Sequence, residues 1–332
     1  MNPSLKSRSP TSPRLLSIVC PAFNEGEHLP VFLAALHTTL QALGQPAELV
    51  LVNDGSKDHT LARMVEWHAR HPNTTIVDLS RNFGKEIAVT AGLDHARGDA
   101  VLVMDTDGQH PVEMIAQLLA FYRDGYDVVV GTRMDRSTDS WLRRSLSRAF
   151  YGLMERSGEV PLPANAGDYR LMSRQVVDTI GAMRERHRFL KGMFAWAGFH
   201  TMQVPFTPPP RLSGHSTFNF WRLWNLSLEG ITSHTLAPLK ASTYVGFVAA
   251  SLALLYAAYI IAKTILYGET VAGFPTLATL ILFLGGIQLM VLGVIGEYLG
   301  RIFTETKQRP LYVVGQRWES SAPPERAATP EP

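Results

Sequence analysis

The chain of 332 residues contains a single cysteine, Cys20. One thiol can form neither an internal disulfide nor a cysteine-based zinc site, so disulfide frameworks are excluded and a reducing compartment is favoured. Charge of either sign is not in excess, because 31 Lys and Arg residues stand against 29 Asp and Glu residues, a net charge of +2. A chain this close to neutral has no general affinity for nucleic acid, and we expect no nucleic-acid partner.

Two common phosphate-binding loops are also missing. No G-x-G-x-x-G follows the first apolar run, and no G-x-x-x-x-G-K-[ST] occurs in the chain. These absences argue against a dinucleotide oxidoreductase and against a P-loop NTPase. The segment from Met1 to Arg14 is rich in Ser, Pro and basic residues and has no apolar centre, which predicts a disordered lead and not a signal peptide. The segment from Glu319 to Pro332, rich in Pro, Ala and Glu, predicts a disordered tail.

Short apolar runs alternate with helical spacings from Leu16 to Val130. Strands are predicted at 16–20, 48–52, 75–79, 100–104 and 127–130, and helices at 27–43, 60–70, 86–97 and 112–122. Pro21 is expected to end the first strand. Strands and helices that alternate with short loops predict an α/β fold, a doubly wound and mostly parallel sheet with helices on both faces.

Polar residues follow the predicted strand ends. Glu25, Asp54, Arg81 and the pair Asp105 and Asp107 all occupy such positions. Ligands of this kind of fold bind beyond the carboxyl ends of the strands. Two carboxylates one residue apart at a strand end can hold a divalent cation against a diphosphate, and hard oxygen ligands suit Mg²⁺ or Mn²⁺ better than zinc. Asp-x-Asp by itself is equally common as a turn.

Several motifs occur together in a fixed order. Four follow the predicted strands: Pro21-Ala-Phe-Asn24-Glu25, Val52-Asn-Asp54-Gly-Ser56, Arg81-Asn-Phe-Gly84-Lys85-Glu86 and Asp105-Thr-Asp107. Five more lie downstream: Gly167-Asp168-Tyr169-Arg170-Leu171, Arg188-Phe-Leu-Lys191-Gly192, Arg211-x-x-Gly214-x-Ser216, Gly296-Glu297-Tyr298-Leu299-Gly300-Arg301 and Arg309-Pro310-Leu311-Tyr312. The first set resembles inverting family 2 glycosyltransferases of the GT-A fold. With the second set, the chain resembles the polyprenyl-phosphate glycosyltransferases, a group of bacterial undecaprenyl-phosphate sugar transferases related to dolichol-phosphate mannose synthase.

This resemblance implies roles for individual residues. Those expected to bind the nucleotide sugar are Pro21, Ala22, Glu25, Asp54, Arg81, Lys85, Asp105, Arg188, Lys191 and Arg211. Those expected to take part in catalysis are Asp105, Asp107, Asp168 and Arg170, and the expected metal ligands are Asp105, Asp107 and Gln109. Those expected to seat the acceptor phosphate are Arg133, Arg143, Arg144 and Ser147, with the choice between the two adjacent arginines left open. The alternatives are a turn or helix cap for Asp54, and a solvated face or ion pairs for the basic residues.

The chain departs from the family pattern at three places. Gln109-His110-Pro111-Val112-Glu113 stands where relatives often have Gln-Asp-Pro-Pro-Glu, and Ser216-Thr217-Phe218 replaces Ser-Lys-Tyr. His215 takes the place of a residue that is often acidic. The departures leave the expected nucleotide site intact and put the sugar or acceptor contacts in doubt. We expect His110 at the surface, and Asp168 and Arg170 in a short polar segment between helices.

Two long apolar stretches predict membrane helices. Residues 241–266 carry one charge and residues 273–295 carry none, so each is long enough to cross the hydrocarbon core, although a buried soluble helix is the alternative. The connector has no Lys or Arg, whereas Lys240, Arg301, Lys307 and Arg309 flank the pair, which predicts both chain ends in the cytoplasm. Aromatic residues at 218–240 predict interfacial helices. Glycines suited to close packing with a partner helix in a homo-oligomer are Gly285, Gly286, Gly293, Gly296 and Gly300.

The expected organisation is a lead at 1–14, a GT-A catalytic domain at 15–217, interfacial helices at 218–240, a two-helix transmembrane hairpin at 241–300, a segment at 301–318 that returns to the catalytic domain, and the tail. The expected activity is inverting transfer of one sugar, with UDP-glucose favoured, to a polyprenyl (undecaprenyl) phosphate at the cytoplasmic face of a bacterial inner membrane, for cell-envelope glycan modification. A processive polysaccharide synthase is a rival, although the Gln-x-x-Arg-Trp motif is missing. A non-catalytic nucleotide-sugar-binding membrane subunit is the other, and it would be expected to have lost Asp-x-Asp or the basic cluster.

Overall fold

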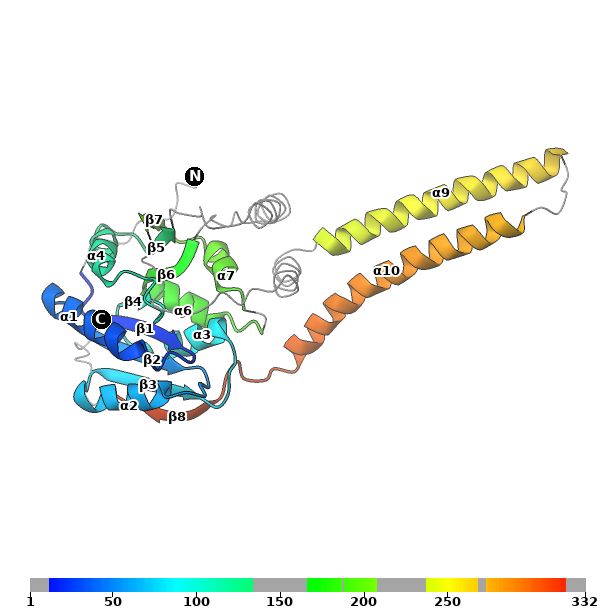
Figure 1. Ribbon diagram of the computed structural model, residues 1–332. Coiled ribbons are helices and arrows are strands. Elements are labelled where there is room, and N and C mark those ends of the chain that lie inside the picture. The colour runs from blue at the N-terminus through cyan, green and yellow to red at the C-terminus, as the bar shows by residue number, and fades with distance from the viewer. Residues whose placement is uncertain (1–11, 134–165, 187, 208–236, 268–272, 321–332) are drawn as a thin grey trace, which may run out of the picture. The chain divides into compact units, whose positions relative to one another are not determined.

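The computed structural model describes residues 12–133, 166–186, 188–207, 237–267 and 273–320 (Figure 1). They fall into two compact units. The first contains the described residues up to 207 together with 310–320, and the second contains 237–309. The chain therefore leaves the first unit, forms the second, and returns to the first.

The first unit is built from alternating strands and helices. In chain order its elements are β1 (Leu16–Ala22), α1 (Leu29–Leu43), β2 (Ala47–Asn53), α2 (Thr60–Arg70), β3 (Thr74–Leu79), α3 (Lys85–His95), β4 (Ala100–Val103), the 3-10 turn η1 (Val112–Met114), α4 (Ile115–Arg123), β5 (Val128–Arg133), β6 (Ala166–Ser173), α6 (Arg174–Ala182), α7 (Leu190–Ala197), β7 (Thr201–Phe206) and β8 (Val314–Trp318).

Eight strands form one sheet in the order β7-β5-β6-β4-β1-β2-β3-β8. The pairs β1–β2, β1–β4, β2–β3 and β5–β7 are parallel. The pairs β4–β6, β5–β6 and β3–β8 are antiparallel, so β6 and β8 run against the other six strands. The prediction of a mostly parallel α/β sheet, as in GT-A folds, is confirmed.

Helices cover both faces of the sheet because its central strands are apolar on both sides. Ile18 and Cys20 of β1 pack into a core with α1, α2 and α4, while Val19 packs into a second core with α3, α6 and α7. All seven residues of β1 are buried. Each large apolar side chain buried in this way contributes about 1.5–3 kcal/mol to stability. The two cores fix the strand ends, and therefore the loops that follow them.

Some strand predictions were wrong. Pro21 does not end β1 but lies inside it, opposite Val52 of β2. It is tolerated because β4 pairs with β1 only as far as Val19, so no partner on that side needs an N–H from Pro21. Strands β6, β7 and β8 were not predicted, although Met202, Val204 and Phe206 of β7 do alternate with more exposed residues as in a half-buried strand.

The second unit is a helical hairpin of α9 (Ala237–Tyr267) and α10 (Phe274–Thr306), which lie side by side (Figure 1). Phe247, Leu266 and Leu289 are each 72% exposed, as expected for helices that need an apolar surrounding. Within the described residues one helical stretch, Phe283–Thr306, is long and apolar enough to cross a membrane. The expected pair of spans is therefore supported for one helix. The interfacial helices expected before α9 lie almost entirely outside the described residues.

Candidate active site at the carboxyl ends of the strands

A cavity of about 280 Å³ lies where the parallel strands end. Its walls come from the end of β1 and the loop after it, the loops after β2, β3 and β4, and the start of α3. The residues that line it are Pro21, Ala22, Phe23, Glu25, Asp54, Asn82, Gly84, Lys85, Ala88, Asp105, Thr106 and Asp107. Seven of these were named from the sequence as site residues, and the sheet order brings them together from segments that lie far apart along the chain.

Asp54 supports one wall of the cavity through its carboxylate. Its Oδ1 accepts a hydrogen bond from the N–H of Phe83 (2.7 Å), and its Oδ2 accepts one from the N–H of Gly84 (3.0 Å). Burial raises the pKa of this carboxyl, and the two N–H donors act in the opposite direction. Asp54 thus holds the loop before α3 in place. The expected contact with the nucleotide base stays a prediction.

Gly55 allows the loops after β2 and β3 to approach each other closely. Its φ is +64°, and a Cβ at this position would lie 2.4 Å from the carbonyl carbon of Arg81. A side chain here would therefore displace the backbone of the neighbouring loop. Arg81 itself does not line the cavity. Its guanidinium lies over the Phe83 ring at 4.1 Å, and Nη1 donates to the carbonyl of Asn82.

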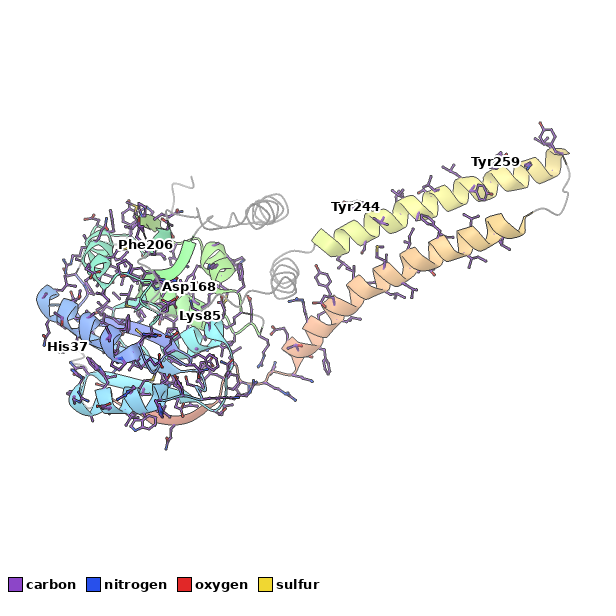
Figure 2. The ribbon with its side chains drawn as sticks, in the orientation of Figure 1. His37, Lys85, Asp168, Phe206, Tyr244 and Tyr259 are labelled. Carbon is purple, nitrogen blue, oxygen red and sulfur yellow. The ribbon has the colours of Figure 1, made fainter. Side chains whose placement is uncertain are left out.

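The Lys85 ammonium joins two carboxylates from distant parts of the chain. Figure 2 labels Lys85 and one of these two partners, Asp168. Nζ lies 2.7 Å from Asp105 Oδ2 and 2.6 Å from Asp168 Oδ2, and Lys191 Nζ lies 3.8 Å from the other oxygen of Asp168. The two lysines lower the pKa of Asp168 to about 2 against the opposing effect of burial. The two carboxylates raise the pKa of Lys85. Lys85 and Asp168 are therefore both charged at neutral pH.

The loop after β4 is held by His110, and the expectation that this residue lies at the surface was wrong. His110 is 4% exposed and stacks on the Tyr169 ring with centroids 4.7 Å apart. Its Nδ1 accepts the main-chain N–H of Asp105 at 2.9 Å, so the proton of the neutral ring is on Nε2. Burial lowers the pKa of His110. The side chain of Asp107 is fixed in the same loop, because its Oδ1 accepts the N–H of Gln109.

Asp168 and Arg170 lie on strand β6 and not in a loop between helices as expected. Arg170 is 5% exposed, with its guanidinium over the Phe194 ring at 3.9 Å. Burial lowers the pKa of Arg170 to about 10. Its Nε has no hydrogen-bond partner within the described parts of the chain. A second, smaller cavity of about 20 Å³ lies here, lined by Lys85, Glu86, Val89, Val103, Gly167, Asp168, Arg170, Met172, Leu190, Lys191 and Phe194.

Arg188 is not brought to either cavity. It is 9% exposed, and its guanidinium donates to the carbonyls of Met183 (2.5 Å) and Ile180 (3.3 Å) near the end of α6. Cations at this position of a helix offset the partial negative charge of its last carbonyls. The arrangement does not support the expected diphosphate contact, because the donors point into the protein.

Of the expected acceptor residues, Arg133 alone lies within the described part of the chain. Arg143, Arg144 and Ser147 lie outside the described residues, and so does Arg211. Arg133 is the last residue of β5, where its backbone pairs with Phe206 of β7. It therefore also lies at a carboxyl strand end.

Phe23 was missed by the sequence analysis, although it lines the larger of these two cavities and is 45% exposed. Asn82 and Thr106 were missed as well. All three stand beside residues that were named, so a rule that takes the whole loop after each strand would have found them.

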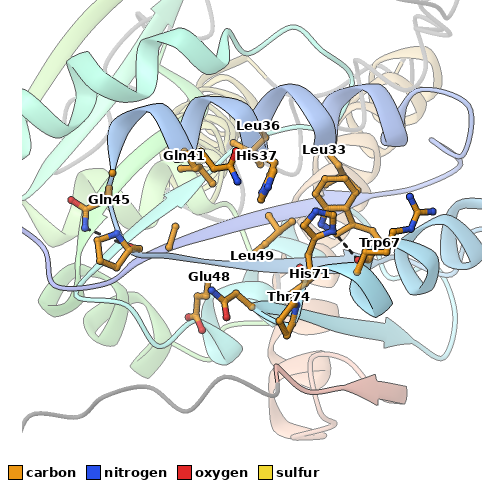
Figure 3. Close-up of a pocket in the computed structure, with 17 residues that line it drawn as sticks. Leu33, Leu36, His37, Gln41, Gln45, Glu48, Leu49, Trp67, His71 and Thr74 are labelled. Carbon is orange, nitrogen blue, oxygen red and sulfur yellow. Dashed lines mark hydrogen bonds between the residues drawn. The ribbon is translucent and has the colours of Figure 1, made fainter.

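A third cavity, of about 680 Å³, lies at the opposite edge of the sheet between the ends of α1 and α2 (Figure 3). Leu36, His37, Trp67 and His71 line it, and the Trp67 and His71 rings stack 3.7 Å apart. Its acidic residue, Glu48, is paired with Arg97 at 2.8 Å. The residues that line this third cavity do not include a cluster of acidic and basic side chains like the one at the carboxyl ends of the strands, which is called the carboxyl edge below.

Comparison with known proteins agrees with this geometry. The profile of Glycosyl transferase family 2 matches residues 17–181, and the profile of the GtrB C-terminal hairpin matches residues 237–302. An uncharacterized glycosyltransferase of Synechocystis is 46% identical over 91% of this chain and 95% of its own. The chain belongs to glycosyl transferase family 2.

Further members of the family have more specific names. A prophage bactoprenol glucosyl transferase homolog of Escherichia coli is 44% identical over 90% of this chain and 98% of its own. The bactoprenol glucosyl transferase of Shigella phage SfX is 44% identical over 91% and 99%. Among solved structures, a mannosyltransferase of Pyrobaculum calidifontis in complex with GDP-Man and Mn²⁺ matches 89% of this chain and 90% of its own at 19% identity, with a TM-score of 0.46.

The donor set of this family 2 member suits a magnesium-type cation that a substrate helps to bind. Groups of three or more His, Cys, Asp or Glu able to enclose a metal are not found in the described part of the chain. Asp105 and Asp107 instead offer two carboxylates at the wall of an open cavity. Mg²⁺ is usually held by one or two carboxylates together with substrate phosphates, so the residues fit such an ion. The Gln109 side chain is buried beside them, at 6% exposed.

Proposed function

We propose that this glycosyltransferase moves one glucosyl residue from UDP-glucose to a polyprenyl phosphate, with inversion at the anomeric carbon. The main observation behind this proposal is the cavity at the carboxyl edge, which is lined by residues of β1 together with Asp105, Asp107 and Lys85. Its size and charge suit a nucleotide diphosphate that arrives with a cation. The names of the relatives, which are 44% identical over nearly the whole chain, support glucose and a bactoprenol acceptor.

The charges of the site suit loss of a diphosphate. A divalent cation, when bound, would neutralise the negative charge that develops on the departing nucleotide. Asp105 and Asp107 would hold it, and the loop that carries them is anchored by His110. Lys191 and Arg170 line the adjoining cavity, which at about 20 Å³ has room for about one water and not for a sugar.

The acceptor explains why no general base needs to be assigned. A sugar hydroxyl must lose a proton before it attacks, whereas a phosphate monoester is already anionic near pH 7. Asp168 has a pKa of about 2 and two lysine partners, so it stays negatively charged at neutral pH. In this position it would orient the sugar donor and would not act as a base. Arg133 at the end of β5 and the expected cluster of Arg143, Arg144 and Ser147 would seat the acceptor phosphate.

We place the reaction at the cytoplasmic face of a bacterial inner membrane. The apolar stretch Phe283–Thr306 supports one membrane span, and α9 would supply the second. The GtrB-type hairpin and the basic residues that flank it support this topology. The polyprenyl tail would then stay in lipid while its phosphate reaches the site.

The experiment is glucose transfer by the full-length protein in detergent, with radiolabelled UDP-glucose and with or without undecaprenyl phosphate. We expect a labelled lipid product and UDP release that depends on the lipid. GDP-mannose and UDP-N-acetylglucosamine serve as matched donors and should be poorer substrates. UDP release that ignores the lipid, or a growing polysaccharide product, would contradict the proposal.

A further inference from the structure

Lys85 occupies an unusual place in the site, because it bridges a candidate metal ligand and a second carboxylate. Asp105 follows β4, whereas Asp168 lies on β6, and the Lys85 ammonium is within 2.7 Å of both. The Lys85 side chain is 46% exposed, and those of Asp105 and Asp168 are 19% and 34% exposed. The lysine thus enters the cluster from the solvent side and can leave it without disturbing the core.

Lys85 is also the residue that lines both cavities of this edge. On one side of it lie Asp105 and Asp107 with the larger cavity, and on the other lie Asp168 and Lys191 with the smaller one. The second cavity has room for about one water, so a donor that fills the first cavity would meet the Lys85 side chain at the boundary between the two. The position therefore links the state of the ion pair to the connection between the cavities.

Resting on the proposed function, we propose that Lys85 is a built-in counter-ion, which a divalent cation displaces from Asp105 when the cation binds. An ammonium at 2.7 Å from Asp105 Oδ2 repels a second cation on the same carboxylate. It also keeps the two acidic groups from repelling each other while no cation is bound. Once released, Lys85 is free to meet the diphosphate, and Lys191 remains as the partner of Asp168.

The alternative is a purely structural bridge, and it predicts the opposite effect on metal binding. If Lys85 only holds the loop after β4 against β6, its removal lets Asp105 move and weakens binding of the cation. If Lys85 competes with the cation, removing it leaves two carboxylates without a counter-charge, and the cation binds more tightly. The sign of the change therefore separates the two.

The test measures Mn²⁺ binding by the full-length protein in detergent, without donor or lipid, from the free-ion signal in electron paramagnetic resonance. We expect Lys85→Met and Lys85→Gln to tighten Mn²⁺ binding about twofold to fivefold, the upper part of the range for losing a half-exposed ion pair. Lys85→Arg, which keeps the charge, should bind like the wild type. Lys57→Met removes a charge from the same edge of the sheet and should also leave Mn²⁺ binding unchanged. Weaker or unchanged binding in Lys85→Met and Lys85→Gln, or no Mn²⁺ binding by any form, would overturn the proposal.

A second measurement uses the wild type and does not depend on a folded variant. The reactivity of the Lys85 amine toward an acetylating reagent is followed by mass spectrometry, with Lys57 as the internal reference. We expect the reactivity of Lys85 to rise when Mn²⁺ is added, because one of its two carboxylate partners is lost. Unchanged reactivity would contradict the displacement. Neither measurement uses sugar transfer. The counter-ion proposal can therefore be disproved while the proposed function is upheld, and the proposed function can be disproved while the counter-ion proposal is upheld.

Discussion

Charged residues serve opposite purposes at the two ends of the strands, here called the amino edge and the carboxyl edge of the sheet. At the amino edge, Glu48 is 4% exposed, and its oxygens accept the Ser17 hydroxyl (2.5 Å), the N–H of Arg97 (2.6 Å) and Nε of Arg97 (2.8 Å). At the carboxyl edge, Lys85, Asp105 and Asp168 are partly exposed around a cavity. The first network is closed and stabilises the sheet, whereas the second is open to ligands. Burial, more than charge, separates a structural network from a functional one.

The largest expected effect is at the carboxyl edge. Asp107→Asn removes a charge from the expected cation site while keeping its shape, and we expect turnover to fall by at least about 100-fold, the scale for losing one transition-state charge contact. The unfolding temperature should not change, since Asp107 is only partly buried. Turnover is measured as lipid-dependent UDP release. A near-normal rate that persists with a chelator present would show that the metal assignment is wrong.

The amino edge should show the reverse pattern. Glu48→Ala leaves Arg97 and Ser17 without their acceptor, and we expect a loss of about 2–3 kcal/mol, less than for a fully buried pair because Arg97 is 35% exposed. Denaturant unfolding of the purified protein measures it. Turnover well below the unfolding temperature should match the wild type. A large loss of turnover with normal stability would show that the amino edge also takes part in catalysis, which contradicts this comparison.

His110 tests whether the open network also depends on buried support. His110→Phe keeps an aromatic ring on Tyr169 but removes the acceptor for the Asp105 N–H, and about a tenfold loss of Mn²⁺ affinity is expected, the scale of one buried hydrogen bond. His110→Asn places an oxygen near the position of Nδ1 and should recover part of it. Equal affinities in the two variants would mean that the hydrogen bond does not position Asp105.

The smallest effect concerns acid stability. Lys85 and Lys191 hold the pKa of Asp168 at about 2, below its value of about 3.9 in an unfolded chain. The unfolded chain therefore takes up the proton first, so the stabilisation is complete above pH 4 and is lost as the pH falls toward 2. Asp168→Asn should flatten the decline of the unfolding temperature between pH 4 and pH 2. A decline as steep as that of the wild type would mean that Asp168 is not held by its lysine partners.

Much of the fold could be predicted because its signals are local. The alternation of apolar runs and helices from Leu16 to Val130 indicated the parallel strands, since each run is buried on both faces. Of the expected residues that line the cavity, Glu25, Asp54, Asp105 and Asp107 follow those strands, Pro21 and Ala22 are the last residues of β1, and Lys85 begins α3. Strand β6 was missed because Asp168 and Arg170 keep it from being a continuous apolar run like β1, although Tyr169 and Leu171 alternate with them.

By itself, the sequence determined the layered α/β plan and the edge at which the chemistry would gather, because strand direction and strand ends follow from local patterns. The tertiary structure alone decided which side chains meet. It brought Asp168 to Lys85 from a distant part of the chain, buried His110 beneath Asp105, and turned Arg188 toward the end of α6. Such contacts depend on how distant segments pair and how deeply each group is buried, and the spacing of residues along the chain determines neither.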